Sequence, residues 1–157
     1  LLLYVSILAT VVFGFFNFRN KAKCFAGDVG SVSMAFLVVF LIAKLIVTTQ
    51  NPIFILYLLI YGLDTVWTIL RRLSKKENIF KAHRSHLYQF MANEAKINKL
   101  LVSSSYGIIQ FALGLIVLYV ALEDQLTNQI RCAVGLIVVC SIVYLVIKQK
   151  IIKKYNL

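Results

Sequence analysis

Acidic residues and proline are scarce in this chain of 157 residues. Six Asp and Glu stand against 17 Lys and Arg, so the formal net charge is +11, and there is a single proline. The three cysteines (Cys24, Cys132 and Cys140) form no CxxC pair, so a disulfide or zinc framework is not indicated. The two histidines also lack a Cys, Asp or Glu at a suitable local spacing, which argues against a zinc site.

Apolar residues, by contrast, are abundant. They make up 61% of the chain and the mean hydropathy is +0.85, whereas soluble domains are about 45–50% apolar. One pass through a bilayer takes about 20 apolar residues. The sequence therefore predicts an all-α, polytopic membrane bundle, a single membrane-embedded unit over 1–157 with about five transmembrane helices. Their predicted positions are 1–16, 30–47, 53–70, 100–122 and 130–147.

The charges fall between these apolar runs in an alternating pattern. Segment 17–28 carries a net charge of +2, segment 71–99 carries +6, and the tail 148–157 carries +4, whereas 123–129 carries −2. Positive connections on alternate sides follow the positive-inside rule. We therefore expect 17–28, 71–99 and the C-terminus on the cytoplasmic side, and we expect no nucleic-acid partner.

The first candidate site is the connection 17–31, which contains Gly27-Asp28-Val29-Gly30-Ser31. Asp28 could simply cap the following helix. It could also bind Mg²⁺, which prefers one or two protein carboxylates together with phosphate oxygens of a substrate. Small glycines at a helix N-terminus would let a phosphate approach the backbone.

The second candidate site is the basic segment His83-Arg84-Ser85-His86. If it is helical, His83 and His86 share a face, and Arg84 offers a planar fork suited to phosphate. The alternative is a solvated loop attracted to anionic lipid. Both candidate segments lie on the predicted inner side, which favours a shared nucleotide-diphosphate site there.

One carboxylate lies inside an apolar run. Asp64 is about two helical turns before Arg71, too far for a simple pair within one helix. Intramembrane acids are costly unless they are paired or face a polar cavity. Asp64 therefore either supports a polar site or pairs with a group on another helix.

These segments together resemble the polyprenyl-phosphate N-acetylhexosamine-1-phosphate transferases, in particular the enzymes that use UDP-GlcNAc and undecaprenyl phosphate. Residues 17–31 are similar to the family's Asn…Pro-Ala-Lys…Phe-x-Gly-Asp-x-Gly-Ser segment, and 83–89 resemble its histidine motif. Asp64-Thr65, followed by Arg71-Arg72, is similar to the helix before that motif. The likeness covers roughly 13–90.

The resemblance implies an enzyme that transfers N-acetylhexosamine 1-phosphate from a UDP-sugar to polyprenyl phosphate. Such enzymes start O-antigen or related cell-envelope glycans at the cytoplasmic face of the bacterial inner membrane. The implied partners are the UDP-sugar, the polyprenyl phosphate and membrane lipid, with a homodimer left open, and the implied cofactor is Mg²⁺ or Mn²⁺. The implied catalytic residues are Asp28, which is also the metal ligand, His83 and His86; the implied substrate-binding residues are Asn17, Lys23, Gly27, Gly30, Ser31 and Arg84.

The sequence also departs from the family. Lys21 stands where the family usually has proline, and the family's paired aspartates and aspartate-rich loop are absent. In family members those acids precede this segment. Because Leu1 already begins an apolar run, we expect a C-terminal portion of a longer protein that is inactive alone. The competing hypothesis is a non-enzymatic scaffold or transporter portion whose basic loops bind anionic lipid.

Overall fold

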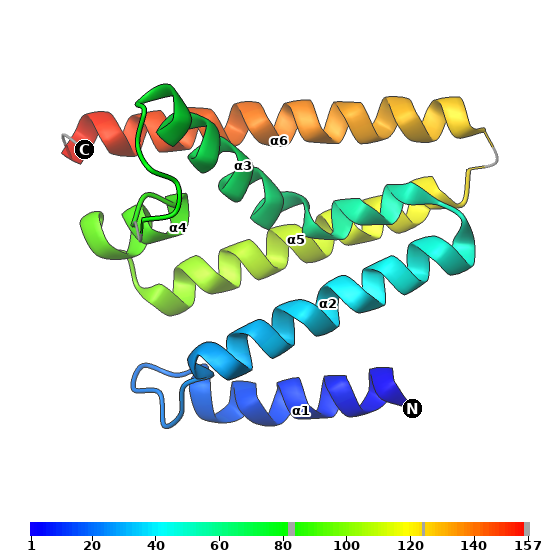
Figure 1. The fold of residues 1–157 in the computed structure, drawn as a ribbon, viewed down its shortest axis with the longest axis horizontal. Coiled ribbons are helices and arrows are strands. Elements are labelled where there is room, and N and C mark those ends of the chain that lie inside the picture. Colours follow the sequence, from blue (N-terminus) through cyan, green and yellow to red (C-terminus); the bar gives the residue numbers. More distant parts are fainter. Residues whose placement is uncertain (82–83, 124, 156–157) are drawn as a thin grey trace. The chain divides into compact units, whose positions relative to one another are not determined.

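The protein is helical throughout the part that the structure describes. This structure, a computed structural model, describes residues 1–81, 84–123 and 125–155 (Figure 1). It contains no strand within those ranges, which confirms the predicted all-α class. The elements are α1 (Leu2–Asn17), α2 (Gly27–Thr49), the 3₁₀ helix η1 (Pro52–Leu58), α3 (Leu59–Ser74), the single turn α4 (Leu87–Gln89), the π-helical turn η2 (Phe90–Glu94), α5 (Lys99–Ala121) and α6 (Leu126–Tyr155).

Four helical segments in the described part are long and apolar enough to cross a membrane. They are α2, the continuous η1–α3 segment Pro52–Ser74, α5 and α6, with 23 to 30 residues each. Many large apolar side chains of these segments are exposed; in the most apolar parts of α2 and α6 only 6% of the residues are buried inside the protein. This is the composition of a multi-pass membrane protein. Helix α1 is also apolar, but with 16 residues it is shorter than these four segments.

The chain divides into two compact units, which we describe separately. The first, Leu1–Leu41, contains α1 and the first part of α2. None of the residues of α1 is buried. A hollow of about 410 Å³ lies between the two helices of this unit, lined mainly by apolar side chains together with Ser6, Thr10 and Ser33.

The second unit, Ile42–Leu157, has a core built around η1. Helix α5 runs along η1, and α3 and α6 contact each other beside it (Figure 1). Val117 of α5 is fully buried, and the Cβ of a side chain at Gly114 would lie 3.5 Å from the Tyr57 ring. The small residue thus lets α5 approach η1 closely. The core consists of Ile53, Phe54, Leu56, Leu59, Leu113, Val117 and Val120.

The predicted helix 53–70 changes geometry part-way along. The segment Pro52–Leu58 is a 3₁₀ helix, and the α-helix begins at Leu59. Such a change leaves backbone groups without their usual i→i−4 partners. The Gln110 side chain of α5 takes up two of them, accepting from Ile60 N at 2.9 Å and donating to Leu56 O at 3.2 Å. Gln110, a polar residue in the apolar run 100–122, thus provides hydrogen-bond partners for two backbone groups at the change of helix type.

Pro52 and Asn51 fix the start of this segment. Pro52 occupies its first position, and the Asn51 side chain accepts a hydrogen bond from Ile53 N at 3.1 Å. The same Asn51 amide donates to Gln129 Oε1 at 3.0 Å, and Gln129 donates to the backbone oxygen of Glu123 at 2.6 Å. These bonds fix the end of the unit that the sequence places outside.

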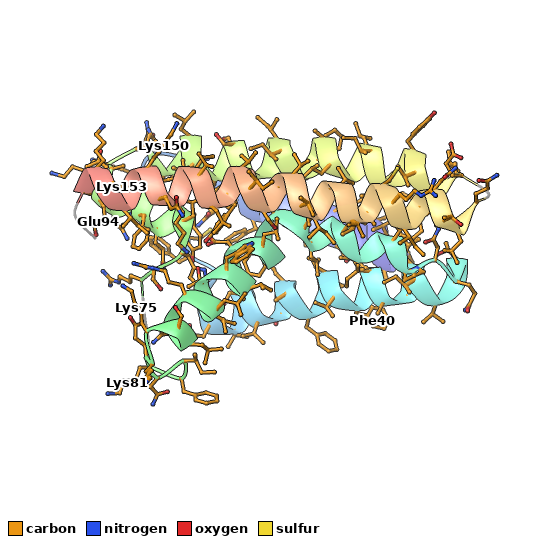
Figure 2. All side chains as sticks on the ribbon, turned by 90° about the horizontal axis from the view of Figure 1, so that it is seen from above. Phe40, Lys75, Lys81, Glu94, Lys150 and Lys153 are labelled. Atoms are coloured by element: carbon orange, nitrogen blue, oxygen red, sulfur yellow. The ribbon has the colours of Figure 1, made fainter. Side chains whose placement is uncertain are left out.

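Many cations of the second unit lie at its opposite end. Lys75, Lys81, Lys150 and Lys153 gather at one end of the unit in Figure 2, on the left of the view. They come from two segments that the charge pattern assigns to the same side, 71–99 and 148–157. The arrangement of this unit is therefore consistent with the positive-inside assignment.

Candidate functional site

The first candidate segment is a folded connection in the first unit. Asn17 Nδ2 donates to the Cys24 carbonyl at 2.8 Å, and Lys23 N donates to the Phe16 carbonyl at 2.9 Å. These two bonds draw the connection back onto the end of α1. Asn17, predicted to contact substrate, thus holds the loop, while the Lys23 side chain is exposed.

Helix α2 begins at the two glycines of this segment. Gly27 has a φ of +62°, a conformation that costs glycine little and other residues more. At Gly30 a Cβ would lie 3.2 Å from the Ala26 Cβ, so a larger residue would crowd the turn. The Ser31 hydroxyl donates to the backbone oxygen of Asp28 at 3.1 Å. Gly27, Gly30 and Ser31 therefore shape the first turn.

Asp28 lies in that first turn, and its side chain is exposed. None of the described residues donates a hydrogen bond to its carboxylate or forms an ion pair with it. The carboxylate is thus not used for capping. Mg²⁺ takes one or two protein carboxylates and completes its shell with water and phosphate oxygens. An exposed, unengaged Asp28 fits that role as one ligand, although the described residues contain no group of three acidic, His or Cys side chains suited to a metal.

The second candidate segment lies in the second unit. Arg84 is exposed, and His86 directly precedes the short turn α4. His86 has extended backbone angles (φ −71°, ψ 149°), so a helical i,i+3 pairing with His83 does not apply at this residue. His83 itself lies outside the described residues. The backbone N of His86 donates to Gln89 Oε1 at 3.3 Å, which fixes the start of α4.

Asp64 of α3 anchors this segment. Its side chain is buried, at 3% exposure, and Oδ1 accepts from Leu87 N at 2.9 Å. The same oxygen lies 3.6 Å from His86 Nδ1. A carboxylate in the membrane helix therefore binds the backbone next to His86 and faces the imidazole ring, the arrangement that orients a histidine.

A second set of polar groups reaches Asp64 from α6. The Tyr144 hydroxyl donates to Asp64 Oδ1 at 2.7 Å, and Lys148 Nζ donates to the Tyr144 oxygen at 2.6 Å. Lys148 also donates to Thr68 Oγ1 at 2.8 Å, and it is only 4% exposed. Asp64 and Lys148 thus form a buried pair of opposite charges linked through two hydroxyl groups, and the pairing offsets the cost of burying each charge.

Sequence reasoning missed the α6 half of this cluster. The predicted last helix ended at 147, and Lys148 was counted in the net charge of the tail 148–157. The helix in fact continues to Tyr155, and the Tyr144 and Lys148 side chains on one of its faces are buried. The i,i+4 spacing of these two residues was the available signal, because it places a hydroxyl and an ammonium group on the same helix face.

Arg72 organises the connection after α3. Its guanidinium is buried and donates to Glu77 Oε2 at 3.1 Å and to the carbonyls of Asn78, Ile79 and Lys81 at 2.6, 3.4 and 3.3 Å. One buried side chain therefore satisfies several backbone groups of a loop. That role explains why the second of the two adjacent arginines points inward.

A hollow of about 430 Å³ adjoins the histidine segment. Its walls include Tyr88 and Tyr106, whose rings meet edge to face with centroids 6.4 Å apart, and Lys99. The His86 ring stacks on Tyr88 at a centroid distance of 5.6 Å. Burial, together with the nearby negative charge of Asp64, raises the pKa of Tyr88 above its ordinary value, so Tyr88 is a neutral hydrogen-bonding group at physiological pH.

Comparisons with known proteins return no match: no family model, no curated protein and no solved structure is similar to this chain.

Proposed function

We propose that this chain is part of an enzyme that transfers N-acetylhexosamine 1-phosphate from a UDP-sugar to a polyprenyl phosphate. The observation that carries the proposal is the anchoring of the histidine segment by a membrane helix, in which buried Asp64 binds Leu87 N and faces His86. The other support is an exposed, unengaged Asp28 in a glycine-shaped first turn.

The proposed reaction has one displacement step. An oxygen of the polyprenyl phosphate attacks the sugar-bearing β-phosphorus of the UDP-sugar, and the bond from that phosphorus to the bridging oxygen breaks. UMP leaves with the bridging oxygen, and polyprenyl-diphospho-sugar forms. Mg²⁺, when bound, neutralises the phosphate charge that develops in such a transfer.

The residues of this chain act mainly by position and charge. Asp28 is the proposed metal ligand in a turn shaped by Gly27, Gly30 and Ser31. His83, Arg84 and His86 are the proposed diphosphate contacts, with Asn17 and Lys23 as further contacts. In this proposal Asp64 anchors the backbone beside His86 through Leu87 N and faces the imidazole ring, which places His86 for contact with the diphosphate.

The proposed location is the bacterial inner membrane, with the site on the cytoplasmic face. The gathering of cations at one end of the second unit supports this orientation (Figure 2). A transporter would be expected to have broken helices around its substrate. The break between η1 and α3 is such a feature, but Gln110 occupies both of the backbone groups named above, which favours the enzyme.

The test is UMP release by the full-length gene product, purified and supplied with UDP-N-acetylhexosamine, undecaprenyl phosphate and Mg²⁺. His86→Ala is expected to slow turnover by about 100-fold, the usual scale for one lost preorganised charge contact. Arg84→Lys, which keeps the charge and loses the fork, should give a smaller defect. Exposed Lys81→Ala in the same loop is the matched control and should keep near-normal turnover. Equal defects in all three variants would favour general attraction to anionic lipid instead.

A further inference from the structure

A groove runs between α3 and α6 in the second unit, apart from both candidate segments. It encloses about 420 Å³, and its walls include the apolar side chains of Trp67, Leu70 and Leu145. Arg71 and Lys148 line the same groove, and Gln149 adds an amide. The groove therefore combines an apolar surface with two cationic groups, both on helices long enough to cross a membrane.

The positive charge in this groove is only partly balanced. Lys148 shares a hydrogen-bonded cluster with Asp64, through Tyr144. The neighbouring Arg72 is paired with Glu77. In the part of the chain that the structure describes, however, the Arg71 guanidinium forms no hydrogen bond or ion pair; it lies 6.0 Å from the centroid of the Phe90 ring. Within the described residues, the Arg71 guanidinium in this groove therefore has no anionic partner.

The same aromatic ring brings the two cations together. Lys148 Nζ lies 5.9 Å from the Phe90 centroid, close to the distance found for Arg71. Their positive charges add near this ring, and a bound anion would offset the part of that charge that Asp64 does not balance. A planar guanidinium is the group best suited to bind a phosphate through two parallel hydrogen bonds.

We propose that this groove binds the phosphate headgroup of an anionic phospholipid, with Arg71 as the main contact and an acyl chain along Trp67, Leu70 and Leu145. A soluble phosphate would gain nothing from the apolar walls. A phospholipid gains both the apolar contact of its acyl chain and the electrostatic contact of its phosphate. Its phosphate would lie at the depth where α3 passes from apolar residues to Arg71 and Arg72. This site is independent of the proposed transferase activity.

Trp67, the only tryptophan of the sequence, reports on the groove directly. The protein is reconstituted into phosphatidylcholine vesicles, and Trp67 fluorescence is quenched with increasing mole fractions of dibrominated phosphatidylglycerol or, separately, dibrominated phosphatidylcholine. The ratio of the two apparent binding constants is the preference for the anionic lipid. We expect that preference to be several-fold in 0.1 M salt and to shrink at 1 M salt, where screening is stronger.

Arg71→Gln removes the charge and none of the hydrogen bonds described above, so circular dichroism should show unchanged helicity. It should lower the anionic preference by roughly fivefold, the effect of one basic residue near a membrane surface. Lys75→Gln, the same change in net charge at an exposed position outside the groove, should leave the preference nearly intact, and Arg71→Lys should retain most of it.

Three results would overturn the proposal. One is equal quenching by both brominated lipids in the unsubstituted protein. Another is an equal loss of preference in Arg71→Gln and Lys75→Gln, which would mean general surface charge. The third is release of phosphatidylglycerol quenching by equimolar undecaprenyl phosphate, which would assign the groove to the polyprenyl chain instead of to a phospholipid.

Discussion

Replacing Tyr144 by Phe tests the buried cluster between α3 and α6. The hydroxyl donates to Asp64 at 2.7 Å and accepts from Lys148 at 2.6 Å, so the change removes two hydrogen bonds that involve charged groups. Each such bond contributes about 1.5–3 kcal/mol. Part of the loss is compensated, because Asp64 keeps Leu87 N and Lys148 keeps Thr68. We therefore expect a net destabilisation equal to about one such bond, 1.5–3 kcal/mol.

Ordinary hydrogen bonds between membrane helices are weaker. In double-mutant cycles they contribute only about 0.6 kcal/mol each on average. The same pair of helices supplies a control of that kind. Trp67 Nε1 donates to Ser141 Oγ at 3.2 Å, a neutral bond between α3 and α6. Ser141→Ala should therefore cost about 0.6 kcal/mol, several times less than Tyr144→Phe.

The assay is reversible unfolding in mixed micelles of increasing dodecyl sulfate content, with the midpoint taken from Trp67 fluorescence and checked by circular dichroism. The reasoning is refuted if Tyr144→Phe shifts the midpoint no more than Ser141→Ala. In that case the Asp64–Lys148 cluster would be no stronger than a neutral contact.

Three further predictions concern the helix break, the topology and the need for other chain segments. Gln110→Leu leaves two backbone groups at the break unpaired and should cost about 1–3 kcal/mol for each, measured by the same unfolding assay. With the native cysteines replaced, an impermeant thiol reagent added outside cells should label a cysteine at Gln125 but not at Lys76 or Lys153. Labelling at Lys76 would reverse the orientation. Residues 1–157 expressed alone should release no UMP, because the transferases that they resemble carry paired aspartates that this sequence lacks; turnover by them would contradict a site completed elsewhere.

The helical class and the approximate helix positions could be predicted from the sequence. Apolar runs of membrane length leave few alternatives to helices, because every backbone polar group must be satisfied inside the segment. The ends were predicted less well. Lys148 was counted with the charged tail, but a long lysine stem can pass along an apolar helix face to reach Thr68 and Tyr144, which link it to Asp64.

The break within the third apolar run was not predictable from composition. Residues 53–58 are all apolar and contain no proline or glycine, and the backbone groups at the break are bonded by Gln110, more than 50 residues later in the chain. The role of Asp64 could be predicted only in part. An acid inside an apolar run indicates a buried partner, but Leu87 N and Tyr144 follow from tertiary packing alone.

The most direct test of the central proposal is UMP release at saturating Mg²⁺ by the full-length gene product carrying Asp28→Asn, beside a Lys75→Ala/Lys76→Ala double variant. Asparagine keeps the shape of the side chain and removes the charge that a hard cation needs, so turnover should fall by about 100-fold or more. The double variant should stay near normal, since both lysines are exposed at the end of α3. Loss of turnover in the lysine variant with none in Asp28→Asn would contradict the transferase assignment.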